Sequence, residues 1–460
     1  MRLEDRQAAL AEAGMPSGVG IDDIGGRLDR LPITWLHAAL IAACAVGFGF
    51  DLLEMALGNA LSAVFSAPPH SLPASRLSPL LSAVYFGGLI GAPALGWLAG
   101  RIGRRAVLSA GLLWLAAMSL AMVFTDSIPW LTAIRALAGI ALGAYPPLML
   151  ALLTDVLPAA RRGLLIMATI ALAALGQPAG ILLVRWLTPI QPLGIEAWKW
   201  AFLLGGAGAV GAAILFRMVP ESPRWLAAAG RAAEAEAAFH AFAASRVLWR
   251  PKETPGPLSV PRPADPYPPF RRYRRAFTVV SGLYFLGPWA LVGFPLVTGA
   301  VLIGKGYRLS DTLLYIGIAS FGAFLGTFAS AFAVDRFERR SALAICAGAM
   351  ALAVMAFAVG GSPAWLIASN LAFFFMSNIY LAALGLYTAE LFPTRLRSTA
   401  SASAWAVNRL GSVLAPPALL FLLHTRGSAP MFATVIAILA LSVAIVLGFG
   451  PRGRAGESVE

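Results

Sequence analysis

Twelve long blocks of apolar residues dominate the sequence and decide what it can fold into. An α-helix needs about 20 apolar residues to cross roughly 30 Å of hydrocarbon. Hydrophobic residues make up 59% of the chain and charged residues 12%, against about 25% charged in an ordinary soluble domain. We therefore expect an all-α membrane protein with twelve transmembrane helices. The expected spans are 33–65, 78–100, 105–125, 129–157, 163–188, 198–219, 276–304, 310–334, 341–360, 363–389, 398–423 and 430–450.

The basic residues follow a pattern that a membrane imposes. The net charge is +13, and most of the 35 Lys and Arg residues lie in the two tails and in alternate loops. Cytoplasmic loops carry such an excess of Lys and Arg. The pattern places both termini and the long central loop in the cytoplasm. It argues against nucleic-acid binding, which would gather basic residues on one polar face.

One connection is much longer than the others and divides the chain. Residues 220–275 begin with the sequence PESPRWL, continue with an Ala-rich stretch that we expect to be helical to about Trp249, and end in a Pro-rich and Arg-rich run. The segment is too short and too rich in proline for a catalytic domain, so we interpret it as a linker. The predicted organisation is a cytoplasmic tail (1–32), a six-helix half (33–219), the linker (220–275), a second six-helix half (276–450) and a cytoplasmic tail (451–460).

The two halves repeat each other in sequence. An offset of 235 residues carries Arg101, Arg104 and Arg105 to Arg336, Arg339 and Arg340, Asp155 to Glu390, and Pro158 to Pro393. Two parallel repeats of six spans, with a ligand site between them near the midplane, are the architecture of a large class of transporters. We therefore expect pseudo-symmetric halves around a central site.

These residues resemble the major facilitator superfamily over essentially the whole chain. The segment 96–105 (GWLAGRIGRR) is similar to the signature loop of that superfamily, with Gly100 where the family usually has Asp. Arg135 and Gly139 are similar to its Arg-x-x-x-Gly feature. The resemblance implies a secondary transporter that works by alternating access, in which the halves rock around a midplane site.

Three further segments narrow the resemblance. The start of the linker, 220–226, is similar to that of sugar porters, organic-ion transporters and synaptic-vesicle-like proteins. Residues 387–398 (YTAELFPTRLRS) are similar to the organic-ion and vesicle-like branch, which includes bacterial niacin-type carriers, and residues 48–54 (FGFDLLE) to the metabolite:proton symporters. Span seven reads SGLYFLG at 281–287 and lacks the paired glutamines usual in sugar porters, which disfavours a sugar.

Asp51 and Glu54 are the first candidates for function, because both lie in the middle of a span. At positions i and i+3 they share one face of the helix. A charge at the bilayer centre costs roughly 2.5–3.5 kcal/mol on insertion scales, so neither is expected to face lipid. Such a pair can bind and release a proton near neutral pH, as a proton symporter requires. The alternative is that they form structural pairs with buried arginines or hydrogen-bond in a hydrated cavity.

Arg135 is the third candidate in the first half. A guanidinium stays charged in proteins, so it needs a counter-ion or a cavity. It can pair with Asp51 or Glu54, or bind an anionic substrate, and a structural ion pair near the membrane edge is the alternative. Its counterpart at the 235-residue offset is Asn370, which favours a coupling role.

Charged residues at the cytoplasmic ends of the spans suggest a gate. We expect a network that closes the inner side in the outward-facing state, since rocking of the halves breaks and remakes such pairs. For the arginines, a role in topology alone is the alternative. The network comprises Arg101, Arg104, Arg105, Asp155, Arg161, Arg162, Asp335, Arg336, Arg339, Arg340, Glu390, Arg395 and Arg397.

Polar and aromatic residues deep in the spans are candidates for substrate binding. Prolines at 146, 147, 178 and 288 free backbone carbonyls, which is tolerated where a cavity or a partner receives them. Each candidate can equally serve helix packing. The candidates are Tyr145, Gln177, Tyr284, Trp289, Asn378, Tyr380, Asn408 and Arg409, of which Arg409 is the strongest candidate for an anion.

No constellation for enzymatic chemistry stands out. Cys44 and Cys346 lie within apolar spans and suggest neither a disulfide framework nor a metal site. The sequence contains no phosphate-binding loop of the Gly-x-x-x-x-Gly-Lys type. We expect no catalytic residues, no metal and no cofactor. We also expect residues 21–31 to form a short amphipathic helix on the inner leaflet.

The sequence thus predicts proton-coupled import of a small organic anion, such as an aromatic or pyridine carboxylate. The alternatives are efflux of a drug or metabolite, sugar uptake, and a membrane sensor that binds ligand without transport. The expected partners are the small-molecule substrate, protons and the lipid bilayer, with no nucleic acid, and the chain is expected to be a monomer. The abundance of Arg and Ala suggests a GC-rich genome, and with the resemblance it suggests a bacterial inner membrane.

Overall fold

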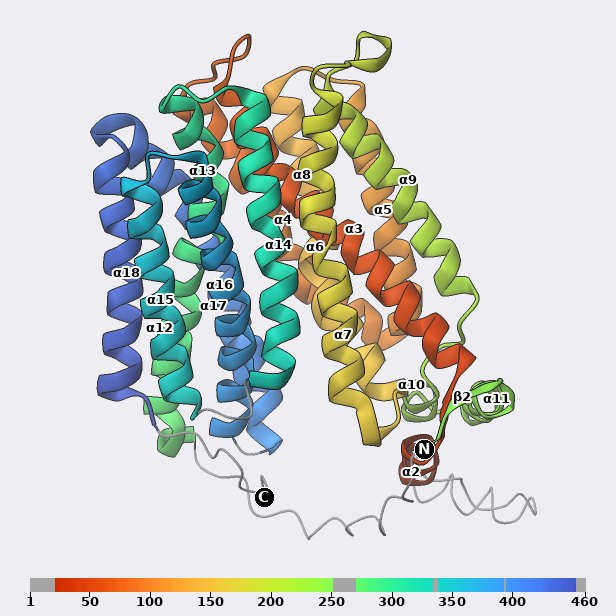
Figure 1. The fold of residues 1–460 in the computed structure, drawn as a ribbon. Helices are drawn as coiled ribbons and strands as arrows, with labels where there is room; N and C mark the ends of the chain where they lie inside the picture. The colour runs from red at the N-terminus through yellow and green to blue at the C-terminus, as the bar shows by residue number, and fades with distance from the viewer. Residues whose placement is uncertain (1–20, 251–269, 334–337, 393, 452–460) are drawn as a thin grey trace, which may run out of the picture.

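A computed structural model describes residues 21–250, 270–333, 338–392 and 394–451, most of them helical. Within these residues, twelve helical segments are long and apolar enough to cross a membrane. The predicted fold class is therefore confirmed. Figure 1 shows two helical bundles side by side, with both ends of the described chain at one end of the molecule, which we call the terminal end.

The first half contains six spans. They are α3 (Trp35–Ser66), α4 (Ala74–Ile102), α5 (Arg104–Val123), α6 (Ile128–Val156), α7 (Arg162–Ala174) continued by α8 (Gly176–Leu187), and α9 (Ala197–Arg217). Short 3-10 turns, η1 (Ala159–Arg161) and η2 (Pro192–Gly194), lie in its loops.

The second half also contains six spans. They are α12 (Arg274–Pro288) continued by the π-helical turn η4 (Trp289–Gly293) and α13 (Phe294–Gly304), then α14 (Leu309–Ala333), α15 (Arg339–Val359), α16 (Pro363–Leu391), α17 (Thr394–Arg426) and α18 (Ser428–Phe449). The turn η3 (Phe270–Tyr273) precedes α12. The wide turn η4 follows Pro288, because proline removes a hydrogen bond from the helix and a π turn absorbs the mismatch.

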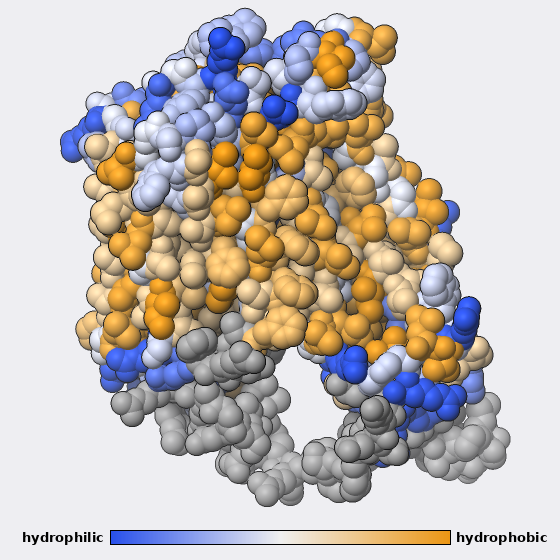
Figure 2. Space-filling view, in the orientation of Figure 1, coloured by the Kyte–Doolittle hydropathy of each residue, from blue (hydrophilic) through white to orange (hydrophobic). Residues whose placement is uncertain are grey.

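The surface of the two bundles fits a bilayer. Large side chains such as Trp35, Phe86, Phe328 and Leu352 are exposed along the spans. Figure 2 shows a broad hydrophobic band around the visible face, with hydrophilic residues gathered at both ends. In water such a band would be costly, and in lipid it is the surface that a polytopic protein needs.

The helix crossings repeat between the halves, as the sequence offset predicts. A Cβ on Gly87 of α4 would lie 1.8 Å from the carbonyl oxygen of Ala136 in α6. A Cβ on Gly322 of α14 would lie 2.3 Å from the carbonyl oxygen of Leu371 in α16. The offset of 235 residues carries Gly87 to Gly322 and Ala136 to Leu371, so the two contacts are equivalent. Glycine at these points lets the backbones approach closely, which is how helices associate in lipid.

The charged residues at the terminal end repeat in the same way. Arg104 of α5 pairs with Asp155 of α6, and Arg339 of α15 pairs with Glu390 of α16 at 2.8 Å between Nε and Oε1. Each pair lies within one half. The two halves contact each other instead through α3 with α13, α4 with α17, and α14 with α7 and α8.

The linker and the residues before the first span fold together against the first half. The helices α10 (Pro223–Ala228) and α11 (Ala232–Ala244) confirm part of the helical expectation, but Val247–Trp249 forms a strand, β2, that pairs with β1 (Ile33–Thr34). The expectation of helix to Trp249 was therefore wrong over its last residues. Backbone pairing with the extended residues before α3 satisfies those peptide groups instead.

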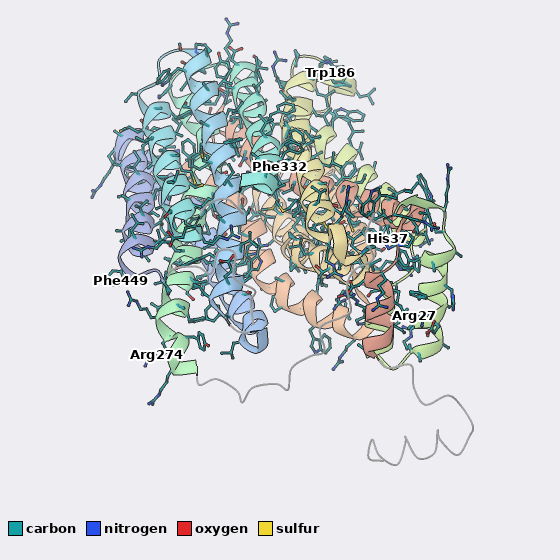
Figure 3. All side chains as sticks on the ribbon, turned by 60° about the horizontal axis from the view of Figure 1, so that its bottom comes forward. Arg27, His37, Trp186, Arg274, Phe332 and Phe449 are labelled. Atoms are coloured by element: carbon teal, nitrogen blue, oxygen red, sulfur yellow. The ribbon has the colours of Figure 1, made fainter. Side chains whose placement is uncertain are left out.

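The helix expected near residues 21–31 is present as α2 (Ile21–Asp29), but its apolar face packs against the linker. Ile24 and Leu28 are buried against Trp225, Leu226 and Phe239 of the linker helices. Figure 3 shows α2, with Arg27 labelled, beside these helices at the terminal end. The expected position on the inner leaflet was thus wrong, since the linker offers this helix an apolar partner. The predicted boundaries of tails, halves and linker stay a prediction.

The crowded crossing at Gly87 gives a test of the fold. Gly87→Ala should lower the stability of the protein in detergent by about 1–3 kcal/mol, because overpacking forces the backbones apart. Gly100→Ala on the same helix is the control, since a Cβ there has nothing within 4 Å. Thermal unfolding that is unchanged in both variants would contradict this packing.

Candidate functional site

A cavity of about 300 Å³ lies between the two halves. It is lined by helices α3, α4, α6 and α8 of the first half and by α12, η4, α13, α16 and α17 of the second. Asp51 is the anionic side chain and Arg409 the cationic side chain among the described lining residues. The position between halves agrees with the site expected for a two-repeat carrier.

Asp51 reaches the cavity because of the periodicity of α3. Leu52, Met55 and Asn59 line the cavity together with Asp51, as residues spaced by three to four positions share one face of a helix. The Asp51 side chain is only 3% exposed, and its Oδ1 has no hydrogen-bond partner among the described residues. A buried acceptor without a partner is costly, so this oxygen is available to a proton or a ligand.

Glu54 does not line the cavity, contrary to the expectation that it shares a face with Asp51. It is 1% exposed, and its Oε1 accepts a hydrogen bond from Ser119 of α5. Three residues correspond to 300° of helical rotation, or a separation of about 60° around the axis. That angle is enough to place Asp51 toward the cavity and Glu54 between packed helices of the first half.

Arg135, like Glu54, lies among the packed helices of the first half and does not line the cavity. It is 3% exposed, the Glu54 carboxyl is close enough to act on its charge, and its guanidinium carbon lies 5.8 Å from the ring centroid of Phe202 in α9. Glycine at position 58 makes room for it, since a Cβ there would lie 3.2 Å from the Arg135 Nη2. Of the two carboxyl partners expected for Arg135, the packing thus favours Glu54.

Arg409 reaches the cavity from the second half. It is 9% exposed, its guanidinium carbon lies 5.2 Å from the ring centroid of Trp405, and the Asp51 carboxyl is close enough to act on its charge. Its Nη2 donates a hydrogen bond of 3.2 Å to the carbonyl oxygen of Gly143 in α6. This arginine therefore contacts both halves.

The other predicted substrate-binding residues divide into two groups. Gln177, Asn378 and Asn408 line the cavity with Arg409. Tyr145, Tyr284, Trp289 and Tyr380 do not belong to its lining. Tyr145 instead packs with its ring 6.1 Å from that of Phe48, and the Tyr284 carbonyl accepts a hydrogen bond of 3.2 Å from Asn408. Their roles in binding stay predictions.

Sequence reasoning missed the aromatic part of the lining. Phe48, Tyr85, Phe374 and Trp405 all border the cavity. Trp405 was within reach of prediction, because it precedes Arg409 by four residues and so lies on the same face of α17. The other three come from different helices, and no local spacing brings them together.

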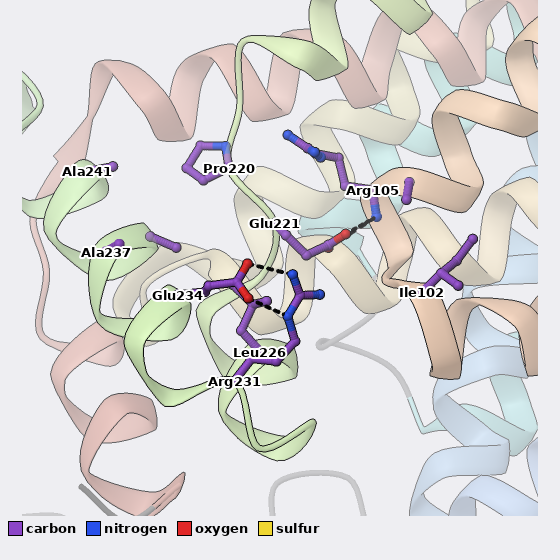
Figure 4. A pocket seen from close by; sticks show the side chains of 11 residues that line it. Ile102, Arg105, Pro220, Glu221, Leu226, Arg231, Glu234, Ala237 and Ala241 are labelled. Atoms are coloured by element: carbon purple, nitrogen blue, oxygen red, sulfur yellow. Dashed lines mark hydrogen bonds and ion pairs between the residues drawn. The ribbon is translucent and has the colours of Figure 1, made fainter.

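The predicted gating residues of the first half gather at the terminal end. Asp155 pairs with Arg104 and accepts a hydrogen bond of 3.2 Å from Ser222 of the linker. Glu221 accepts two bonds of 3.1 Å from the backbone N–H of Arg105, as Figure 4 shows. An anion suits this place because Arg105 lies in the first turn of α5, where the helix end carries partial positive charge.

The remaining gating residues have separate partners. Arg101 lies over the Trp97 ring at 3.8 Å, Arg161 lies over the Trp249 ring at 4.0 Å, Arg162 pairs with Asp29, and Arg340 donates to the Leu447 carbonyl. Asp335 and Arg336 lie outside the described residues, as do the side chains of Arg395 and Arg397. The gating role of these residues stays a prediction.

Asp29 and Glu236 join this cluster, although sequence reasoning did not select them. Asp29 pairs with Arg162 and also with Arg224, at 2.7 Å, and Arg27 pairs with Glu236 at 2.5 Å. The hydrogen bond from Arg27 holds the pKa of the Glu236 carboxyl below its usual value. These contacts tie α2 to the linker and to the first residue of α7.

The buried Glu54 gives a prediction about stability. Ser119→Ala removes a hydroxyl that donates to the Glu54 carboxylate, and a buried acceptor left without its donor costs about 1–3 kcal/mol. Thermal unfolding in detergent should show the loss. Ser109→Ala on the same helix is the matched control and should unfold like the parent protein, whereas equal stability of all three would show that Glu54 does not depend on Ser119.

Comparison with known proteins adds an independent line of evidence. The sequence profile described as Major Facilitator Superfamily matches residues 39–416. The putative metabolite transport protein YyaJ of Bacillus subtilis is 25% identical over 94% of this chain and 96% of its own length. The niacin transporter NiaP of Acinetobacter baylyi is 24% identical over 95% and 99%. The gallate transporter of Pseudomonas putida is 28% identical over 91% and 94%.

The fold is also that of a solved transporter structure. A partially occluded, inward-open conformation of the xylose transporter XylE from E. coli superposes with a TM-score of 0.71, covering 92% of this chain and 99% of that chain. The sequence identity is 18%, so this likeness speaks for the fold alone.

Proposed function

The chain belongs to the Major Facilitator Superfamily, and from that premise we propose that this secondary transporter imports a small aromatic or pyridine carboxylate together with protons. The observation that carries the proposal is the pair of oppositely charged side chains, Asp51 and Arg409, among the described residues that line a cavity between the two halves. The chain is an integral multi-pass membrane protein. We place it in a bacterial inner membrane as a monomer, with both termini in the cytoplasm.

Arg409 supports a carboxylate as ligand. A guanidinium presents donors in a planar fork that matches a carboxylate with two parallel hydrogen bonds. The Nε of Arg409 has no partner among the described residues, and Asn408 lies beside it on the cavity wall. One cation in the lining fits one carboxylate, which disfavours dicarboxylates.

The shape and lining of the cavity support a small ring. Phe48, Tyr85, Phe374 and Trp405 offer aromatic surface, on which a flat ring can stack. A volume of about 300 Å³ lies at the small end of ligand sites. Among the relatives, two are named as transporters of niacin and of gallate, both of which are rings that carry a carboxylate.

Charge balance supports proton coupling. Asp51 and Arg409 together are neutral, and an arriving carboxylate alone would leave one uncompensated negative charge in a buried site. Uncompensated buried charge is strongly unfavourable. A proton on Asp51 restores neutrality, so anion and proton enter together. Glu54 is less suited to this task, because its carboxylate is engaged by Ser119 behind the cavity.

Uptake into proteoliposomes with an alkaline interior tests the proposal. The panel is nicotinate, benzoate, 4-hydroxybenzoate, a dicarboxylate and a hexose. We expect gradient-driven accumulation of one of the ring monocarboxylates. Asp51→Asn should abolish this accumulation but preserve exchange of labelled for unlabelled ligand, and Glu54→Gln should reduce it less.

The control variant is Asp126→Asn, which removes a carboxyl that is 81% exposed and should transport normally. Full gradient-driven uptake by both Asp51→Asn and Glu54→Gln would end the idea of proton coupling through these residues. Accumulation of the hexose alone, or extrusion of panel members, would favour the alternatives of sugar uptake or efflux.

A further inference from the structure

The hydrogen bond between Arg409 and Gly143 joins the two halves at the cavity. Arg409 belongs to α17 of the second half, and Gly143 belongs to α6 of the first. The bond runs from the Arg409 Nη2 to the Gly143 carbonyl oxygen over 3.2 Å, and both residues are buried. A hydrogen bond from a charged donor is worth more than one between neutral groups. This contact therefore favours the conformation in which it forms.

The Gly143 carbonyl is available for this bond because of a proline one turn later. In an α-helix, the carbonyl of residue 143 accepts from the N–H of residue 147. Residue 147 is Pro147, which has no N–H, although α6 continues as a helix through it. Pro146 likewise frees the carbonyl of Leu142. The Gly143 carbonyl is the one that accepts from the arginine of the other half.

Small residues bring the arginine to that carbonyl. A Cβ on Gly143 would lie 2.4 Å from the Cα of Gly88 in α4, and a Cβ on Gly88 would lie 3.6 Å from the Nη1 of Arg409. The crossing of α4 and α6 therefore has no side chains over its backbone at this point. The guanidinium lies directly on the crossing.

The bond engages only half of the edge that a carboxylate would use. The Nε and Nη2 atoms form one edge of a guanidinium, and a carboxylate can bind that edge with two parallel hydrogen bonds. Here Nη2 donates to Gly143, while Nε is buried without a partner among the described residues. Nη2 carries two hydrogens, and a carboxylate on this edge takes the one beside Nε. Because the carboxylate is charged, it is a stronger acceptor than the neutral Gly143 carbonyl, and it draws the guanidinium toward itself and away from that carbonyl.

We propose that Arg409 is a ligand-operated latch between the halves, which holds the carbonyl that Pro147 leaves free and releases it when a carboxylate binds the Nε–Nη2 edge. Before binding, the latch stabilises the present conformation. After binding, the guanidinium is satisfied by the ligand, and the halves are free to rock. Pro147 is then a positioning residue, which acts through Gly143. The ligand part of this inference rests on the proposed function, but the latch itself does not.

The latch predicts how the ligand-free conformational equilibrium responds to two substitutions. In Pro147→Ala, the restored N–H can take the Gly143 carbonyl back into the helix, so Arg409 loses its acceptor. In Arg409→Gln, the charged donor itself is gone. Since a hydrogen bond to a charged group contributes about 1.5–3 kcal/mol, each variant should raise the ratio of the alternative conformation to the present one by about tenfold or more without ligand.

The test is a distance distribution between spin labels on the two halves at the terminal end. Met218→Cys after α9 and Phe449→Cys at the end of α18 supply the labels; their side chains are 64% and 62% exposed, and Phe449 is labelled in Figure 3. Figure 2 shows the two halves apart at the terminal end, so the alternative conformation should bring the two labels closer together there. Both variants should therefore show a second, shorter distance without ligand. Pro93→Ala in α4, which removes a helix proline at an exposed position, is the control and should match the parent protein.

Addition of benzoate or nicotinate should produce the shorter distance in the parent protein but change nothing further in Arg409→Gln. Parent-like distributions in both Pro147→Ala and Arg409→Gln would overturn the latch. A ligand-free shift in both variants, together with a parent protein that ignores every carboxylate, would support the latch and contradict the proposed ligand class. If Pro147→Ala does not fold, Arg409→Gln alone still decides the question.

Discussion

Four buried ionisable side chains in the membrane-spanning region constrain the arrangement of the residues around them. Asp51, Glu54, Arg135 and Arg409 are all less than a tenth exposed, and hydrocarbon offers no water to stabilise a charge. Each must find its compensation inside the protein. The structure does this with two acids and two bases, one of each at the cavity and one of each in the packing of the first half. The fold holds these two neutral groups apart.

Because the two groups are separate, movement of the halves affects their surroundings differently. Glu54 and Arg135 lie among helices of a single half, and Ser119 donates to the carboxylate. Rocking of the halves need not disturb them. Asp51 and Arg409 come from different halves and border a cavity, so both a ligand and a relative movement of the halves change their surroundings. For this reason our proposal assigns the coupling of binding to movement to the second group and not to the first.

Much of the fold could be predicted from the sequence, because a membrane demands long apolar helices and little else satisfies it. All twelve spans and the repeat of the halves followed from this rule and from the 235-residue offset. The docking of α2 could not be predicted in that way. Its apolar face suits lipid or protein equally, and only the tertiary contact with Trp225 and Phe239 decides between them.

The candidate site was harder, since a cavity is made by residues that are distant in sequence. Arg409 and Asp51 stood out because a charged residue within a membrane span is costly unless it has a partner or a function. Tyr145 and Tyr380 were selected on the same ground of polarity, yet they do not line the cavity. A rotation of about 60° around the helix axis decides whether a mid-span residue faces the cavity or a neighbouring helix, as Asp51 and Glu54 show. Span boundaries predicted from the sequence do not fix that angle.

The most direct measurement is an experimental structure of the full chain in lipid nanodiscs with 4-hydroxybenzoate or nicotinate. We expect the carboxylate of the ligand on the Nε–Nη2 edge of Arg409, the ring beside Trp405, and the Gly143 carbonyl no longer bonded to the arginine. A ligand bound elsewhere, or bound in this cavity while Arg409 still donates to Gly143, would contradict this expectation.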